Sequence, residues 1–193
     1  MKGRFNLVLA LLTLGLGAAA QASAGSHPIA VPGTEGFKVI VASPDSIIAT
    51  FQGNSGSFSN DLYLMLDGGG NPGDDGDFSN DRFIFNNLTS TVGDTQNLGS
   101  FAGGTELIFR LHVTDTDEQF YTGPAARNAD NAFHARVQAE WQPNETLVSF
   151  EDLFDGPYDF NDLSFSFTNT VSQPVPVRAL SWGALKGQFA GQR

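Results

Sequence analysis

Residues 106–113 read Glu-Leu-Ile-Phe-Arg-Leu-His-Val, and this stretch decides the fold class. Its apolar side chains recur at every second position, at Leu107, Phe109, Leu111 and Val113. A period of two is that of a β-strand, whose successive side chains point to opposite faces of a sheet. The stretch therefore predicts a strand with one buried face, as in an antiparallel sheet that packs on a core.

Seven further segments are predicted as strands, and none beyond the N-terminal 24 residues has the pattern of an amphipathic helix. They are 37–41, 47–51, 62–66, 82–85, 133–141, 146–150 and 163–168. In 133–141 the odd positions from Phe133 to Trp141 form the expected core face, which places His134 on the polar face. Two sheets packed face to face would bury the Phe-rich sides. We expect an all-β fold, an antiparallel β-sandwich of jelly-roll type, with a closed barrel as the main alternative.

Composition is compatible with one domain and restricts its partners. The chain has 193 residues, of which 17 are Phe, and its formal net charge is −11. Such acidity argues against nucleic acid as a partner, because phosphate binding needs a basic face. The absence of cysteine excludes disulfides, thiolate metal sites and a cysteine nucleophile.

The N-terminal segment has the pattern of a secretory signal peptide. Lys2 and Arg4 precede an apolar run from Leu7 to Leu16, and Ala22-Ser23-Ala24 fits a cleavage site before Gly25. We expect a signal peptide at 1–24, an exposed lead-in at 25–36, the sandwich domain at 37–170 and a tail at 171–193. Localisation would then be secreted, extracellular or at the cell surface, with no membrane span after signal cleavage. Residues 25–193 carry a net charge of −13, which suggests a cation as partner.

Two windows concentrate carboxylates without any basic residue. The first spans 67–81 and contains Asp67, Asp74, Asp75, Asp77 and Asp81. The second spans 151–162 and contains Glu151, Asp152, Asp155, Asp159, Asn161 and Asp162. Calcium takes six to eight oxygen ligands, which clustered Asp and Asn can supply while intervening glycines let the chain curl. Both windows are predicted to hold Ca²⁺; solvated turns, or turns capped by their own carboxylates, are the alternative.

The second window carries the stronger prediction, because its acids alternate with Leu153, Phe154, Tyr158 and Phe160 beside a predicted strand. Carboxylates held near apolar surface need a partner. Its sequence resembles the signature of a bacterial secreted family, domain of unknown function 4114. The matching motifs are Phe150-Glu151-Asp152-Leu153 and Asp159-Phe160-Asn161-Asp162-Leu163-Ser164-Phe165.

Other parts of residues 45–170 are similar to exported proteins that carry PEP-CTERM sorting tails, although the tail here lacks the apolar helix and the arginine cluster. The resemblance implies calcium binding at Glu151, Asp152, Asp159, Asn161 and Asp162, in a cell-surface or matrix protein. Asp155 stands where the family more often has Gly, so the resemblance bears on it less directly.

Three functions compete on the sequence. The first is a secreted, non-catalytic calcium-binding module of the bacterial surface or extracellular matrix. The second is a calcium-dependent carbohydrate-binding module, for which Tyr121 in a Gly-Pro loop is the exposed aromatic candidate, while Trp141 is expected in the core. A hydrolase is the third, and we expect no enzyme because no nucleophile motif stands out. His112 and His134 could hold zinc together with a carboxylate if their strands are neighbours. The alternative, which we favour, is that both histidines are simply exposed on the polar faces of their strands. Partners would be calcium and extracellular polysaccharide or surface proteins.

Overall fold

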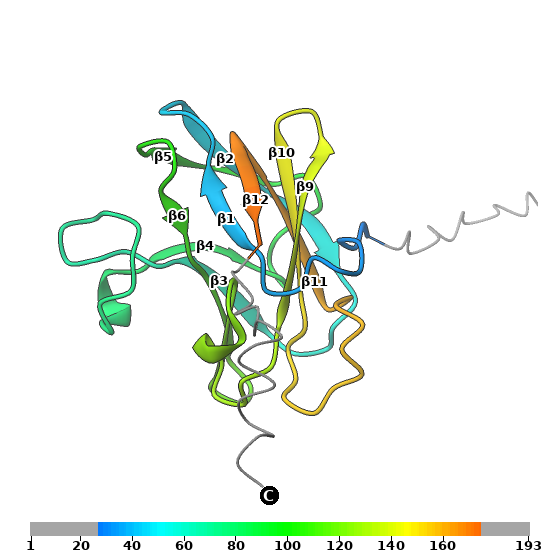
Figure 1. The fold of residues 1–193 in the computed structure, drawn as a ribbon. Coiled ribbons are helices and arrows are strands. Elements are labelled where there is room, and N and C mark those ends of the chain that lie inside the picture. The colour runs from blue at the N-terminus through cyan, green and yellow to red at the C-terminus, as the bar shows by residue number, and fades with distance from the viewer. Residues whose placement is uncertain (1–26, 175–193) are drawn as a thin grey trace, which may run out of the picture.

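The computed structural model describes residues 27–174, and these residues form strands with two single 3-10 turns (Figure 1). The strands are β1 (Lys38–Val41), β2 (Ser46–Asn54), β3 (Asn60–Leu64), β4 (Arg82–Asn86), β5 (Thr95–Ser100), β6 (Glu106–Leu107), β7 (Phe109–Val113), β8 (Glu118–Tyr121), β9 (Ala135–Gln142), β10 (Glu145–Phe150), β11 (Leu163–Thr168) and β12 (Thr170–Gln173). The 3-10 turns are η1 (Phe78–Asn80) and η2 (Ala125–Arg127). In this part of the chain no helix has the length and apolar character to cross a membrane.

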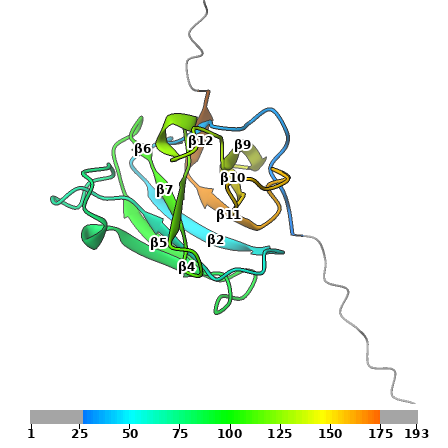
Figure 2. The same cartoon turned by 90° about the horizontal axis from the view of Figure 1, so that it is seen from below.

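The strands pair antiparallel in three sheets. Five strands follow the order β5-β2-β11-β10-β9, four follow β4-β3-β7-β8, and three follow β12-β1-β6. Strands β2 and β11, far apart in sequence, lie side by side in the first sheet (Figure 2). The all-β sandwich predicted from the sequence is confirmed; the jelly-roll topology stays a prediction.

Each of the eight predicted segments overlaps a strand, but the single strand predicted through residues 107–113 is two strands, β6 and β7, which lie in different sheets. Three further strands have no period-two signal. In β5, β8 and β12 most side chains are polar, so that β5 (Thr-Gln-Asn-Leu-Gly-Ser) buries only Leu98. These strands lie at sheet edges, where a strand contributes few core side chains.

Phenylalanine rings from facing sheets fill the space between the layers. Phe167 of β11 stacks on Phe109 of β7 with ring centroids 4.0 Å apart. Phe165 of β11 and Phe51 of β2 both pack against Phe85 of β4. Phe109, Phe165 and Phe167 come from the alternating apolar positions of their strands, whereas in β4 the adjacent Ile84 and Phe85 are both buried.

At two corners a single residue separates consecutive strands that belong to different sheets. The chain leaves β6 and enters β7 at Ile108, and it leaves β11 and enters β12 at Asn169. Asn169 has a φ of 55°, a left-handed conformation that Asn tolerates better than most residues. Its Nδ2 donates to the carbonyl oxygens of Ser43 (2.7 Å) and Asp45 (2.9 Å). The corner therefore depends on both the backbone conformation and the amide of Asn169.

Replacing Asn169 with alanine should lower the free energy of unfolding by about 2–3 kcal/mol, because hydrogen bonds and a tolerated left-handed conformation are lost together. Asn169→Gly removes the same hydrogen bonds but accepts a positive φ, and it should be less destabilising by about 1 kcal/mol. Urea unfolding of the two variants measures this difference. Equal losses would show that the conformation of the corner contributes nothing.

The predicted boundaries of the domain need two corrections. The expected exposed lead-in packs on the five-stranded sheet: Ala30 is 1% exposed, and its amide donates to Ser149 Oγ at 2.8 Å. Ser149 Oγ also lies 2.8 Å from Ser164 Oγ of β11, and Ser164 and Ser166 are buried like the phenylalanines that alternate with them. At the other end, β12 continues past residue 170 to Gln173 and pairs with β1. The predicted signal peptide and residues 175–193 of the predicted tail lie outside the described residues.

Candidate metal centre

The second acidic window forms the connection between β10 and β11 at one end of the sandwich, the gold loop at the bottom of Figure 1. It lies beside the connection between β2 and β3. The amides of Ser55 and Gly56 donate to the carbonyl oxygen of Asp162, at 2.9 and 3.2 Å. Residues more than 100 positions apart in sequence therefore build this end of the molecule together.

Three carboxylates of this window converge on one point. Ligand oxygens of Glu151, Asp152 and Asp162 lie within 4.8 Å of one another. Glu151 is 1% and Asp152 2% exposed, directly after the last buried residue of β10. Within residues 27–174 no lysine, arginine or histidine forms an ion pair with any of the three. Negative charge is thus concentrated at a buried position without a protein cation to balance it.

The burial of these carboxyl groups and the concentration of negative charge raise the pKa of Glu151 and of Asp152. Burial, reinforced by repulsion from Asp162, raises the pKa of Glu151 to about 7. Burial also raises the pKa of Asp152 to about 6, against the lowering effect of a hydrogen bond from Asn60. Both shifts express the free energy needed to ionise the group in the absence of a counter-charge.

Asn60, the first residue of β3, completes the surroundings of the cluster. It is fully buried, and its Nδ2 donates to Asp152 Oδ2 at 2.8 Å. Its Oδ1 has no hydrogen-bond partner within the described residues, which is costly for a buried amide oxygen. Gly56 leaves room above the acids, since a Cβ there would lie 3.1 Å from Asp152 Oδ2.

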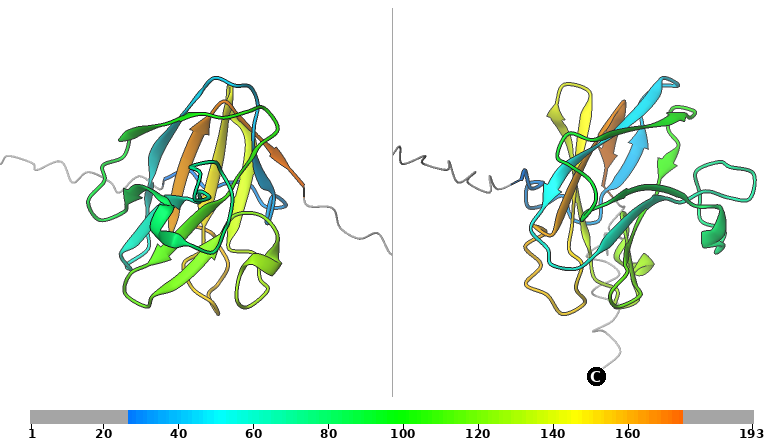
Figure 3. Two further views of the ribbon diagram at one scale, coloured as in Figure 1. Left: turned by 90° about the vertical axis from the view of Figure 1, so that its left-hand side faces the viewer. Right: turned by 180° about the vertical axis from the view of Figure 1, so that it is seen from behind.

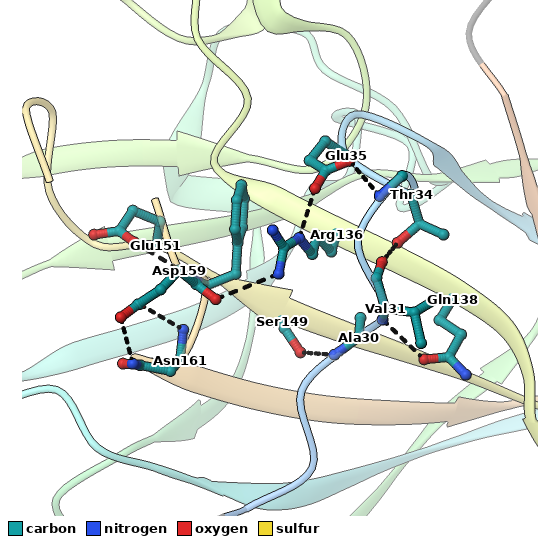
Figure 4. Close-up of polar contacts among 12 residues, drawn as sticks. Ala30, Val31, Thr34, Glu35, Arg136, Gln138, Ser149, Glu151, Asp159 and Asn161 are labelled. Carbon is teal, nitrogen blue, oxygen red and sulfur yellow. Dashed lines mark hydrogen bonds and ion pairs between the residues drawn. The ribbon is translucent and has the colours of Figure 1, made fainter. Parts of the chain in front are cut away.

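The remaining predicted ligands of the second window lie outside the cluster. Asn161 Nδ2 donates to Asp159 Oδ2 at 2.6 Å, and the Asp159 carbonyl oxygen accepts from Arg136 at 3.4 Å (Figure 4). Asp155 is exposed at the turn. The flanking Tyr158 and Phe160 both have positive φ, at 49° and 59°. The structure therefore brings Glu151, Asp152 and Asp162 together, leaves the acids Asp155 and Asp159 out of this group, and engages the side chain of Asn161 with Asp159 and Ser55.

His134 packs beside the acidic loop. The prediction that it is an exposed histidine on the polar face of a strand is wrong. The residue precedes β9, is fully buried, and its ring stacks on Phe120 with centroids 4.1 Å apart. Its Nδ1 lies 3.2 Å from the carbonyl oxygen of Glu151, and its Nε2 lies 3.0 Å from Asp130.

Phe133, expected in the core, is instead 38% exposed, because the period-two pattern begins only at Ala135. Trp141, further along β9, is half-buried.

The first acidic window is arranged differently, because its carboxylates accept hydrogen bonds within their own loop. Asp67 Oδ1 accepts from the amides of Gly69 and Asn71, both at 2.9 Å, and Asp75 Oδ2 accepts from the amide of Gly68. The side chains of Asp74 and Asp77 each accept from the amide two residues on.

Asp81 is committed to a buried ion pair. Its Oδ2 lies 3.0 Å from Arg110 Nε, and its Oδ1 accepts from the amide of Leu66 at 3.1 Å. Within residues 27–174 the one group of three or more acidic or histidine side chains close enough to hold an ion is that of Glu151, Asp152 and Asp162. The first window thus has the pattern of capped turns, and no histidine belongs to the group.

The donor set of the cluster fits a hard divalent cation. All its candidate ligands are carboxylate oxygens, which Ca²⁺ and Mg²⁺ prefer and which soft transition metals do not select. Three carboxylates supply up to six oxygens, and the free Asn60 Oδ1 is a buried oxygen of the same kind beside them. Sequence reasoning missed Asn60 and Gly56, because nothing in residues 54–60 indicates that they lie beside residues 151–162.

Comparison with protein-family models, with curated proteins and with solved structures found no match for this chain. The resemblance to domain of unknown function 4114 therefore stays a prediction that rests on its motifs.

Proposed function

We propose that the protein is a secreted, non-catalytic module of the bacterial cell surface or extracellular matrix that binds Ca²⁺ through Glu151, Asp152 and Asp162. The observation that carries the proposal is the convergence of these three carboxylates, two of them buried, without a protein cation. Export is supported by the signal-peptide pattern of residues 1–24. Extracellular polysaccharide or surface proteins are the partners proposed for such a module.

The physical role of the ion would be to hold together the two ends of the connection 151–162, since Glu151 and Asp152 begin it and Asp162 ends it. A cation bound to the cluster would neutralise the repulsion that raises the pKa of Glu151 and Asp152. The ion binds the folded state, where the three carboxylates converge, and therefore stabilises it by mass action. With Asp162 fixed by the ion, its carbonyl oxygen would stay in place to accept from the amides of Ser55 and Gly56.

Thermal unfolding across a calcium series tests this proposal. At a calcium concentration about 100 times the Kd, the folded state gains about 2.7 kcal/mol, which corresponds to a rise in Tm of roughly 5–10 °C for a chain of this size. Mg²⁺ at the same concentration should produce a much smaller rise, because it demands octahedral geometry and gives up its water reluctantly.

The variant Asp162→Asn identifies the site. It removes one charge but keeps an oxygen that can accept from the amide of Asp152. We expect the calcium response to vanish while the calcium-free variant melts at or above the temperature of the wild type, since repulsion in the cluster is reduced. Asp155→Asn is the matched control, an acid of the same loop outside the cluster, and it should keep the response. A calcium response that survives in Asp162→Asn, or a wild type that does not respond, would refute the site.

A further inference from the structure

A row of large side chains crosses the outer face of the four-stranded sheet. It contains none of the residues of the acidic cluster. Phe83 of β4 pairs with Tyr63 of β3, Tyr63 with Arg110 of β7, and Arg110 with Tyr121 of β8. Because the neighbours in register on one face of a sheet stand side by side, these four residues form one line across four strands. Their strand neighbours Leu62, Ile84, Leu111 and Phe120 are buried on the core side.

The first acidic window extends this row with another ring. The β3–β4 connection faces the viewer in the left view of Figure 3 and carries Phe78 on η1. The guanidinium carbon of Arg110 lies 4.3 Å from the ring centroid of Phe78 and 4.3 Å from that of Tyr63, so Arg110 is held between two aromatic rings. The ion pair of Asp81 with Arg110 anchors the loop in this position.

The outcome is an exposed aromatic surface made by Phe83, Tyr63, Phe78 and Tyr121, here called the aromatic platform. Phe83 is 46% and Phe78 45% exposed, and the two tyrosines are half-buried. Phe83 meets Tyr63 edge to face with centroids 5.6 Å apart. Arg110, itself buried, joins Phe78 to Tyr63, and Tyr121 follows Arg110 in the register of the sheet. Large aromatic rings that gather on one face and stay partly in water are characteristic of an interaction surface.

A polar row runs parallel to the aromatic platform, two residues along each central strand. Asp61 of β3 pairs with His112 of β7, and His112 pairs with Gln119 of β8. All three side chains are partly exposed. Each of these side chains also has a partner within the protein: Asp61 Oδ1 accepts from Asn86, Gln119 Oε1 accepts from Arg110, and His112 Nε2 lies 2.9 Å from Asp117 Oδ1. The face therefore presents ring surfaces beside a line of partly exposed polar side chains.

We propose that the aromatic platform binds a neutral polysaccharide. A pyranose ring has the same two-sided character: its C–H faces stack on aromatic rings, which carry negative charge on their faces, and its hydroxyls both donate and accept hydrogen bonds. The rings come from β4, β3 and β8 and from η1, with the buried Arg110 of β7 between Tyr63 and Tyr121, and a series of rings of this length fits an extended chain of sugar units better than a single small molecule. Charge favours a neutral chain, because the protein is strongly acidic and would repel an anionic polysaccharide.

The test measures retention of the purified protein on cellulose, chitin, a β-1,3-glucan and a galactomannan, with alginate as the anionic comparator. The wild type should bind at least one neutral polysaccharide and not alginate. Phe83→Ala should weaken that binding about fivefold, the contribution expected from one aromatic contact, and Phe83→Tyr should restore it. Phe133→Ala is the matched control, since Phe133 is exposed to a similar degree (38%) and lies elsewhere, before β9.

Three results would overturn the assignment. The first is a wild type retained by none of the four neutral polysaccharides. The second is binding that Phe83→Ala and Phe133→Ala alter equally, which would remove the platform from the contact. The third is self-association in sedimentation that Phe83→Ala abolishes without any polysaccharide retention, which would make the face an interface between two copies of the chain.

Discussion

Replacement of Arg110 with methionine should lower the free energy of unfolding by about 4 kcal/mol, the range measured when one partner of a buried ion pair is removed. Arg110 and Asp81 have side chains only 3% and 1% exposed, so the variant leaves the Asp81 carboxylate buried without its cation. Arg110 Nη1 also donates to Gln119 at 2.6 Å, and that contact is lost as well. Thermal unfolding should show a Tm lower by roughly 10 °C.

A double-mutant cycle with Asp81→Asn separates charge burial from packing. The asparagine keeps an oxygen that can accept from the amide of Leu66, and it carries no charge that needs a partner. The double variant Arg110→Met/Asp81→Asn should therefore recover a large part of the stability that Arg110→Met loses. A loss below about 1 kcal/mol in Arg110→Met, or additive losses in the double variant, would contradict the role of this ion pair.

The calcium-free protein should become less stable as the pH rises from 4 to 8, opposite to the behaviour of a typical salt-bridged acid. The pKa of Glu151 is raised from 4.5 to about 7 and that of Asp152 from 3.8 to about 6. The folded state therefore binds these protons more tightly than the unfolded chain does. The resulting stabilisation is complete below about pH 4 and is lost as the pH passes through 6 to 7, a change of about 2 kcal/mol or more. Thermal unfolding in a chelator across this pH range measures the change.

Calcium should reverse this dependence, because the ion binds the ionised carboxylates and competes with protons for them. The calcium-induced rise in Tm should therefore be larger at pH 8 than at pH 5. Glu151→Gln should flatten the pH dependence in chelator, whereas Asp155→Asn, outside the cluster, should leave it as in the wild type. A calcium-free Tm that rises steadily from pH 4 to pH 8 would contradict the buried, unbalanced cluster.

The core strands could be predicted from the sequence because each places apolar side chains at alternate positions in the layer between the sheets, although β10 and β11 are buried on both faces. The eight segments with this alternation all overlap strands, and their phenylalanines, such as Phe109 and Phe167, meet in the core. The edge strands β5, β8 and β12 could not be found in the same way, because an edge strand is held by backbone pairing and a few contacts. The burial of Ser149 and Ser164 beside Ala30 could not be predicted from the sequence either, because it depends on where the N-terminal segment packs.

The candidate site was predicted in part. The second acidic window was recognised from its acids beside apolar residues, and three of its six predicted ligands do converge. Position alone does not indicate which oxygens meet: Tyr158 and Phe160, at positive φ, bracket Asp159, which lies outside the group. Asn60 lies about 90 residues away in sequence and reaches the cluster only because β3 begins beside the end of β10.

The sequence by itself determined the fold class and the two acidic windows, because strand period and local composition are properties of neighbouring residues. Only the tertiary structure decided between the windows. In the first, the carboxylates are satisfied by turn amides and by Arg110, which arrives from β7. In the second, burial and mutual proximity leave Glu151, Asp152 and Asp162 without a counter-charge. Long-range neighbours, which no local pattern specifies, determine whether a cluster of acids is a capped turn or a candidate site for a cation.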